Sequence, residues 1–141
     1  MILLDTNIVS EVWRHGPDPQ VEAWFEKQDP AELFICLPVI AELSYGANRA
    51  LLRDKSIRYI DALTTTIHHH YRRKVLASDL AASLKFGEIV AERESRGRPI
   101  GPLDAMIAAI CLVNGATLAT RNVRDFDGLN LKLVNPFEPA A

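Results

Sequence analysis

The stretch Met1-Ile2-Leu3-Leu4-Asp5-Thr6-Asn7 decides how we expect this chain to fold. A short apolar run that ends at a carboxylate is typical of a strand buried on both faces, as in a parallel sheet, with Asp5 at its carboxyl end. Open α/β sheets bind their ligands at that end. Thr6 or Asn7 is then expected to cap a helix whose apolar stripe is Ile8, Val9, Val12 and Trp13. Asp5 therefore has two interpretations, as a cap for that helix or as an acid at the mouth of a crevice.

The composition narrows the class of protein. The chain has 141 residues, of which 48% are hydrophobic and 24% charged, and this suits one folded domain over residues 1–141. The net charge of −2 means that a nucleic acid would have to be held by a local basic cluster. The apolar run at 105–113 is too short to span a membrane, and Asp5 interrupts any secretory signal. We expect a cytoplasmic protein with no membrane segment, in which Cys36 and Cys111 are free thiols.

Apolar segments that alternate with amphipathic ones indicate the fold class. Residues 33–37 and 116–120 are predicted to be buried strands, 75–77 a short strand, and 131–135 an edge strand. Helices are predicted between them. This alternation predicts an α/β fold of three layers, with a largely parallel central sheet covered by helices on both faces.

Two of the predicted helices are defined by their periodicity. Residues 51–67 are expected to form one amphipathic helix, and His68 to His70 its solvated end, because adjacent histidines point in different directions and cannot all bind one ion. A later helix begins after Ser78 or Asp79. Its buried face is predicted to be Leu80, Leu84, Gly87 and Ala91, while Phe86 and Ile89 form a second face packed on another subunit, a partner or a neighbouring helix.

Three acids are expected at the ends of elements on one side of the sheet. They are Asp5, Glu42 on a helix that begins at Pro38, and Asp104 in the first turn of an apolar helix that begins at Pro102. Asp104 has a structural interpretation too, since an acid in the first turn of a helix is favourable there. Three carboxylates brought together repel and need protons or divalent cations, and oxygen ligands suit Mg²⁺ or Mn²⁺. Such ions activate water against phosphodiesters. Motifs for dinucleotides, nucleotide triphosphates and serine nucleophiles are all absent from the sequence.

Four motifs together resemble a PIN domain, and more narrowly the VapC toxins of bacterial toxin–antitoxin pairs, including their FitB-like branch. The motifs are the opening 2–7, Ala41-Glu42-Leu43 followed by Gly46, the helix 103–109, and Leu118-Ala119-Thr120-Arg121-Asn122 with Phe126. The resemblance spans the chain through the closing Val134-Asn135-Pro136-Phe137.

The resemblance implies an Mg²⁺- or Mn²⁺-dependent endoribonuclease that cuts structured RNA such as tRNA or rRNA, inhibited by a small antitoxin and usually dimeric. Asp5, Glu42 and Asp104 match the acidic metal ligands of the family, and Thr120 its hydroxyl at the strand end. The fourth acidic position falls on Asn122, which stays among the expected catalytic residues because its amide can accept a hydrogen bond from water or contact a metal, although it brings no charge. Asp125 is either a compensating acid or an ordinary turn residue.

Basic residues near these acids are the candidates for holding RNA, although arginines are ordinarily solvated. The candidates are Arg93, Arg96, Arg98, Arg121 and Arg124, with residues 72–74 as a weaker group. Two other functions stay open at this point. One is a non-catalytic PIN-like module whose acidic pocket holds a basic segment of a partner, and the other is a nuclease or regulator directed at DNA.

Overall fold

The computed structural model, which describes residues 1–139, contains a five-stranded parallel sheet with β1 (Ile2–Leu4) at its centre. The strand order is β3 (Val75–Leu76), β2 (Leu33–Cys36), β1, β4 (Thr117–Ala119) and β5 (Lys132–Val134). Ile2 is paired with Leu33 on one side and with Thr117 on the other. The central position of β1 explains its continuous apolar run, because both of its edges and both of its faces are covered.

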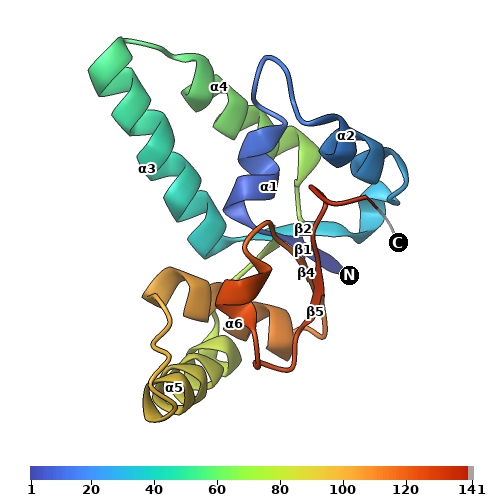
Figure 1. Ribbon diagram of the computed structural model, residues 1–141. Helices are drawn as coiled ribbons and strands as arrows, with labels where there is room; N and C mark the ends of the chain where they lie inside the picture. Colours follow the sequence, from blue (N-terminus) through green and yellow to red (C-terminus); the bar gives the residue numbers. More distant parts are fainter. Residues whose placement is uncertain (140–141) are drawn as a thin grey trace.

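Helices cover both faces of this sheet (Figure 1). On one side lie α1 (Thr6–Glu11), α2 (Pro19–Glu26), α3 (Leu37–Asp54) and α4 (Arg58–Thr65), and on the other lie α5 (Leu80–Ser95) and α6 (Pro102–Val113). Short 3₁₀ turns occur at η1 (Pro30–Glu32) and η3 (Val123–Phe126). The predicted three-layer fold is thus confirmed, with strand boundaries within one or two residues of those expected. No helix within residues 1–139 has the length and apolarity that a membrane span needs.

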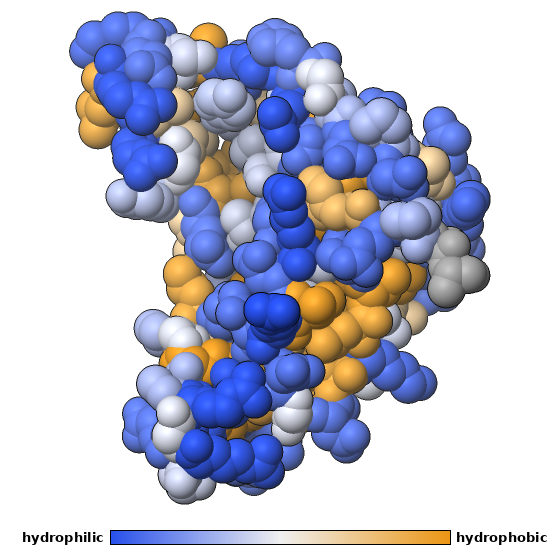
Figure 2. All heavy atoms as spheres, viewed as in Figure 1, coloured by the Kyte–Doolittle hydropathy of each residue, from blue (hydrophilic) through white to orange (hydrophobic). Residues whose placement is uncertain are grey.

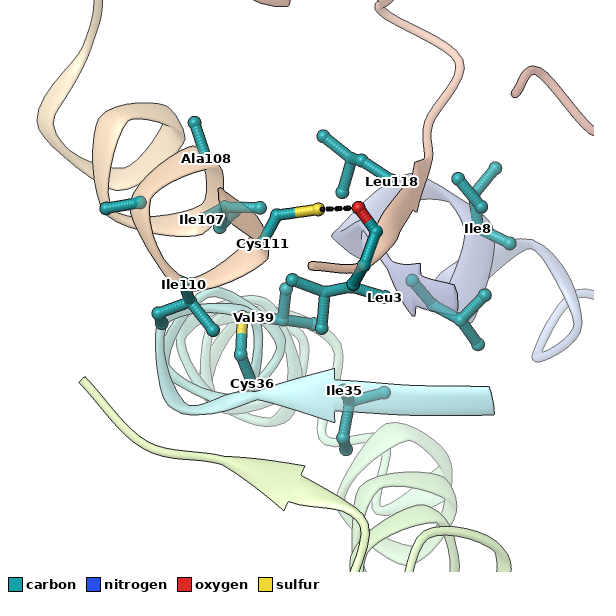
Figure 3. Packing of buried hydrophobic residues seen from close by; sticks show 14 of the residues in the cluster. Leu3, Ile8, Ile35, Cys36, Val39, Ile107, Ala108, Ile110, Cys111 and Leu118 are labelled. Atoms are coloured by element: carbon teal, nitrogen blue, oxygen red, sulfur yellow. Dashed lines mark hydrogen bonds between the residues drawn. The ribbon is translucent and has the colours of Figure 1, made fainter. Parts of the chain in front are cut away.

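The core lies between β1, β2, β4 and the apolar helix α6. Leu3, Ile35 and Ile107 are fully buried, and Figure 3 shows Cys36 on the side of β2 that faces α6 and Ile35 on its other side. Both cysteines are free and buried, as predicted, and the Cys111 thiol donates a hydrogen bond to the carbonyl oxygen of Ala116 at 3.1 Å. Burial raises the pKa of both thiols to about 12, so they stay protonated and act as core residues.

The first helix begins one residue earlier than predicted. Asp5, instead of Thr6 or Asn7, is its N-cap, because the Asp5 carboxylate accepts a hydrogen bond from the Thr6 backbone N–H at 2.8 Å. The helix ends at Glu11, so Val12 and Trp13 lie beyond it. Asp5 therefore does stabilise the helix end, and its second interpretation depends on what else surrounds it.

The prediction of one helix over residues 51–67 is wrong about where that helix begins. Residues 51–54 instead complete α3, which ends because Lys55 adopts a left-handed conformation (φ 58°), and α4 starts three residues later. A π-helical turn, η2 (Thr66–His70), then carries three exposed histidines at the helix end, as expected. Of the apolar stripe expected on this helix, Leu63 is buried and Ile60 and Ile67 are half-buried, whereas Ile57 and Thr64 are exposed. The break before α4 had no glycine or proline to signal it.

The buried face of α5 is also different from the prediction. Leu80 and Leu84 are 76% and 66% exposed, whereas Ile89 is buried and Phe86 packs against the core. Ala82 is also buried. It lies on the same face of the helix as Phe86 and Ile89, because Phe86 is four residues after Ala82 and Ile89 is three residues after Phe86. Two apolar stripes exist on this helix, and periodicity alone could not show which one α6 covers.

Candidate active site

Asp5 lies at the carboxyl end of β1 and is only 4% exposed. Its second carboxylate oxygen accepts a hydrogen bond of 2.7 Å from the Thr120 hydroxyl, which follows the neighbouring strand β4. Desolvation by burial raises the pKa of Asp5, and the hydrogen bonds from Thr120 and Thr6 oppose that effect. Both oxygens are thus oriented by named donors, so the carboxylate is held in one position as well as capping α1.

Glu42 on α3 is brought beside Asp5 by the residue that follows Asp5. The Thr6 hydroxyl donates to the Glu42 carboxylate at 3.1 Å, across 36 positions of sequence. The pKa of Glu42 is raised by desolvation and also by the negative charge of Asp5. The predicted juxtaposition of these two acids is therefore present, and Thr6, which the sequence suggested only as a cap, connects them.

Asp104 completes the predicted set from the first turn of α6. Desolvation, followed by the charges of Asp5, Asp125 and Glu42 in that order, raises the pKa of Asp104 to about 6. Like charges that disfavour one another's ionised forms are the electrostatic sign of a shared site. The structure thus brings Asp5, Glu42 and Asp104 together from β1, α3 and α6.

The fourth acid of this cluster is Asp125. The sequence left open whether Asp125 is a compensating acid or an ordinary turn residue. Its charge acts on both Asp5 and Asp104, although the Asp125 side chain is exposed, as is that of Asn122. Asn122 contributes its backbone N–H instead, which donates to the Thr120 hydroxyl at 3.0 Å. The neighbouring Phe126 is almost fully buried and fixes the turn that carries Asp125.

The arginines predicted near the acids divide into two groups. Arg96, Arg98, Arg121 and Arg124 are exposed, with Arg96 paired to Glu92 and the Arg121 guanidinium 4.4 Å from the centre of the Phe137 ring. Arg93 is buried and bonded to backbone carbonyls, so its position does not fit the predicted contact with RNA. In the weaker candidate group at residues 72–74, the Lys74 ammonium donates a hydrogen bond to the carbonyl oxygen of Pro30, which is not one of the residues of the acid cluster.

The chemistry of these donors fits a hard divalent cation. Within residues 1–139, no group of three or more Asp, Glu, His or Cys side chains is already arranged as a metal site. The four carboxylates are oxygen donors that disfavour one another's charge, and a bound Mg²⁺ or Mn²⁺ removes that repulsion. The carboxylates that would hold such a cation are those of Asp5, Glu42 and Asp104, with Asp125 as the fourth acid whose charge reaches them.

Comparison with known proteins identifies the family. A family model described as the PIN domain matches residues 2–130. This chain is a PIN domain. Among its relatives, the VapC ribonuclease Y4jK of Sinorhizobium fredii is 33% identical over 99% of this chain and 100% of that protein. The tRNA(fMet)-specific endonuclease VapC of Shigella flexneri is 31% identical over 89% of each chain.

Solved structures place this PIN domain among the VapC and FitB toxins. The FitAcB structure from Neisseria gonorrhoeae has a TM-score of 0.84 and 27% identity, and the match covers 98% of this chain and 99% of that one. Other similar solved structures are also toxin–antitoxin complexes. The resemblance inferred from the four sequence motifs is therefore confirmed.

Proposed function

We propose that this PIN domain is the toxin of a toxin–antitoxin pair and acts as an Mg²⁺- or Mn²⁺-dependent endoribonuclease on structured RNA, tRNA or rRNA. The observation that carries the proposal is the cluster of Asp5, Glu42, Asp104 and Asp125, whose charges act on one another at the carboxyl end of the sheet. Relatives named as ribonucleases, one of them specific for a tRNA, support the substrate class.

Each residue of the cluster has a definable part in such a reaction. Asp5, fixed by Thr6 and Thr120, and Glu42, fixed by Thr6, present oriented oxygens. Asp104 and Asp125 add further negative charge from α6 and η3. When bound, the cation neutralises the acids, lowers the pKa of water and stabilises charge on the phosphate. The exposed arginines supply the positive charge that an RNA phosphate requires beside an acidic centre.

Cleavage of purified tRNA and rRNA tests the proposal directly. We expect discrete fragments with Mg²⁺ or Mn²⁺ and none with EDTA, and Asp104→Asn is expected to abolish cleavage. If folded, antitoxin-free protein cuts no RNA with either metal, the non-catalytic binding module becomes the better assignment. Faster cleavage of matched DNA would favour the DNA-directed alternative.

Arg121 is the best-placed arginine for holding RNA. It directly follows Thr120, its backbone N–H donates to the Asn7 side chain at 3.2 Å, and its guanidinium stacks on Phe137. Arg121→Ala is expected to raise KM for RNA about threefold to tenfold with little change in kcat, because a phosphate contact contributes to binding more than to chemistry. Steady-state cleavage assays measure both constants. A fall in kcat at constant KM would contradict this assignment.

A second surface is proposed to receive the antitoxin. A cavity of about 710 Å³ has Val9 of α1 in its lining and none of the four acids of the cluster. We call it the α1 groove, and its apolar lining is Val9, Val12, Trp13, Phe25 and Leu33. Arg58, Asp61 and Lys74 form a polar rim. An apolar floor with a charged rim suits an amphipathic segment of a partner, and similar solved structures are toxin–antitoxin complexes.

Val12→Glu is expected to weaken antitoxin binding at least tenfold, because it places a charge in the apolar floor of the α1 groove. Cleavage by the free toxin should stay unchanged, since Val12 is 44% exposed and lies outside the acid cluster. Co-purification and calorimetry with the antitoxin of the same operon measure the effect. Val113→Glu, at the end of α6, is the control, and equal weakening by both variants would contradict the site.

A further inference from the structure

Arg93, near the end of α5, is the one buried cationic side chain among residues 1–139, at 5% exposure. A guanidinium removed from water is costly unless its N–H groups are bonded. No buried side-chain nitrogen or oxygen in these residues lacks a hydrogen-bond partner. The Arg93 guanidinium is therefore hydrogen-bonded inside the fold, and its bonding partners identify the segments that it connects.

Arg93 ties two segments that are distant in sequence. Its Nε donates to the carbonyl oxygen of Arg98 at 2.8 Å, and its Nη1 donates to the carbonyl oxygen of Asp125 at 3.1 Å. The Arg98 backbone N–H in turn donates to the carbonyl of Arg93 at 2.9 Å. One planar guanidinium thus joins the loop that leads from α5 into α6 with the 3₁₀ turn η3.

Both of these segments deliver an acid to the candidate active site. The loop bonded at Arg98 runs into Gly101, the N-cap of α6, three residues before Asp104. The turn η3 carries Asp125, whose backbone faces Arg93 while its carboxylate charge acts on Asp5 and Asp104. Arg93 thus bonds to the backbone of the two segments that supply Asp104 and Asp125.

We propose that Arg93 is a positioning residue, which holds Asp104 and Asp125 at the spacing that the reaction requires. The proposal rests on the proposed ribonuclease function. It assigns the guanidinium to the two backbone carbonyls instead of to RNA, from which its burial separates it. Outer hydrogen-bond partners of this kind change metal affinity or activity by about 10–100-fold when they are removed.

The test compares Arg93→Met with Arg93→Lys and with the control Arg53→Met, which removes an exposed pair with Asp54 at the end of α3. Mn²⁺ binding is measured by calorimetry on folded protein, and kcat and KM by RNA cleavage. We expect Arg93→Met to lower Mn²⁺ affinity and kcat at least tenfold, with KM for RNA unchanged. Arg93→Lys has one side-chain nitrogen to bond two carbonyls, so its Mn²⁺ affinity and kcat should lie between those of the parent protein and those of Arg93→Met. Arg53→Met should match the parent protein.

The outcomes separate this inference from the function on which it depends. If the parent protein neither binds Mn²⁺ nor cuts RNA, the proposed function fails. If the parent does both and Arg93→Met retains full Mn²⁺ affinity and kcat, the positioning role is wrong. A higher KM with unchanged kcat would also overturn it, in favour of an RNA contact. Should Arg93→Met not fold, Arg93→Lys carries the same comparison, and parental values in that variant would overturn the proposal.

Discussion

Asp5→Asn is expected to lower RNA cleavage by about a thousandfold or more, because it removes one of the charges that would hold the cation. The fold should keep its stability. An asparagine oxygen still accepts from the Thr6 backbone N–H, and its amide N–H is then placed to donate to the Thr120 hydroxyl oxygen in place of the present bond. The change also removes a charge whose burial is unfavourable. Cleavage assays and thermal unfolding of the same preparations measure both effects.

Asp5→Ala is the matched variant, since it removes the helix cap together with the acid. We expect it to lose about 2 kcal/mol of stability, from the missing cap and from the Thr120 hydroxyl left without its acceptor. The pair separates the two interpretations of this residue. Substantial RNA cleavage by Asp5→Asn would mean that Asp5 serves only as the helix cap. Equal stability of Asp5→Asn and Asp5→Ala would mean that Asp5 does not stabilise the helix as a cap.

Asp104→Asn is expected to stabilise the metal-free protein at neutral pH by about 1 kcal/mol, a value reduced for solvent screening because Asp104 is only half-buried. The folded pKa of about 6 lies above the ordinary 3.8. The folded state thus binds more protons between these values, and the stability of the parent protein falls as pH rises through that window. The variant's advantage should be absent below about pH 4 and complete above about pH 6.

Thermal unfolding from pH 4 to pH 8 measures this difference, with the expected gain near 3 °C at neutral pH. Adding Mn²⁺ should reverse the order, because the ion stabilises only the form that binds it. The parent protein is then expected to become the more stable of the two. A difference that is independent of pH, or a variant stabilised equally by Mn²⁺, would contradict the placement of Asp104 in the acid cluster.

Local sequence determined the elements on which this site is built. The apolar run before Asp5 predicted a strand covered on both faces, and the apolar helix that begins at a proline placed Asp104 in its first turn. Such features depend on neighbouring residues and on a periodicity that a short window reveals. The order of alternating strands and helices then predicted the parallel three-layer sheet, because connections between parallel strands require crossovers.

Only the tertiary structure decided which faces and which partners these elements use. Both stripes of α5 are apolar, and the packing of α6 selected Ala82 and Ile89 over Leu80 and Leu84. The choice of Asp125 over Asn122, and the burial of Arg93 against carbonyls from two distant segments, likewise depend on long-range contacts. The physical reason is that residue type determines what a side chain can do, while its neighbours in space determine its charge state, its solvent exposure and its hydrogen bonds.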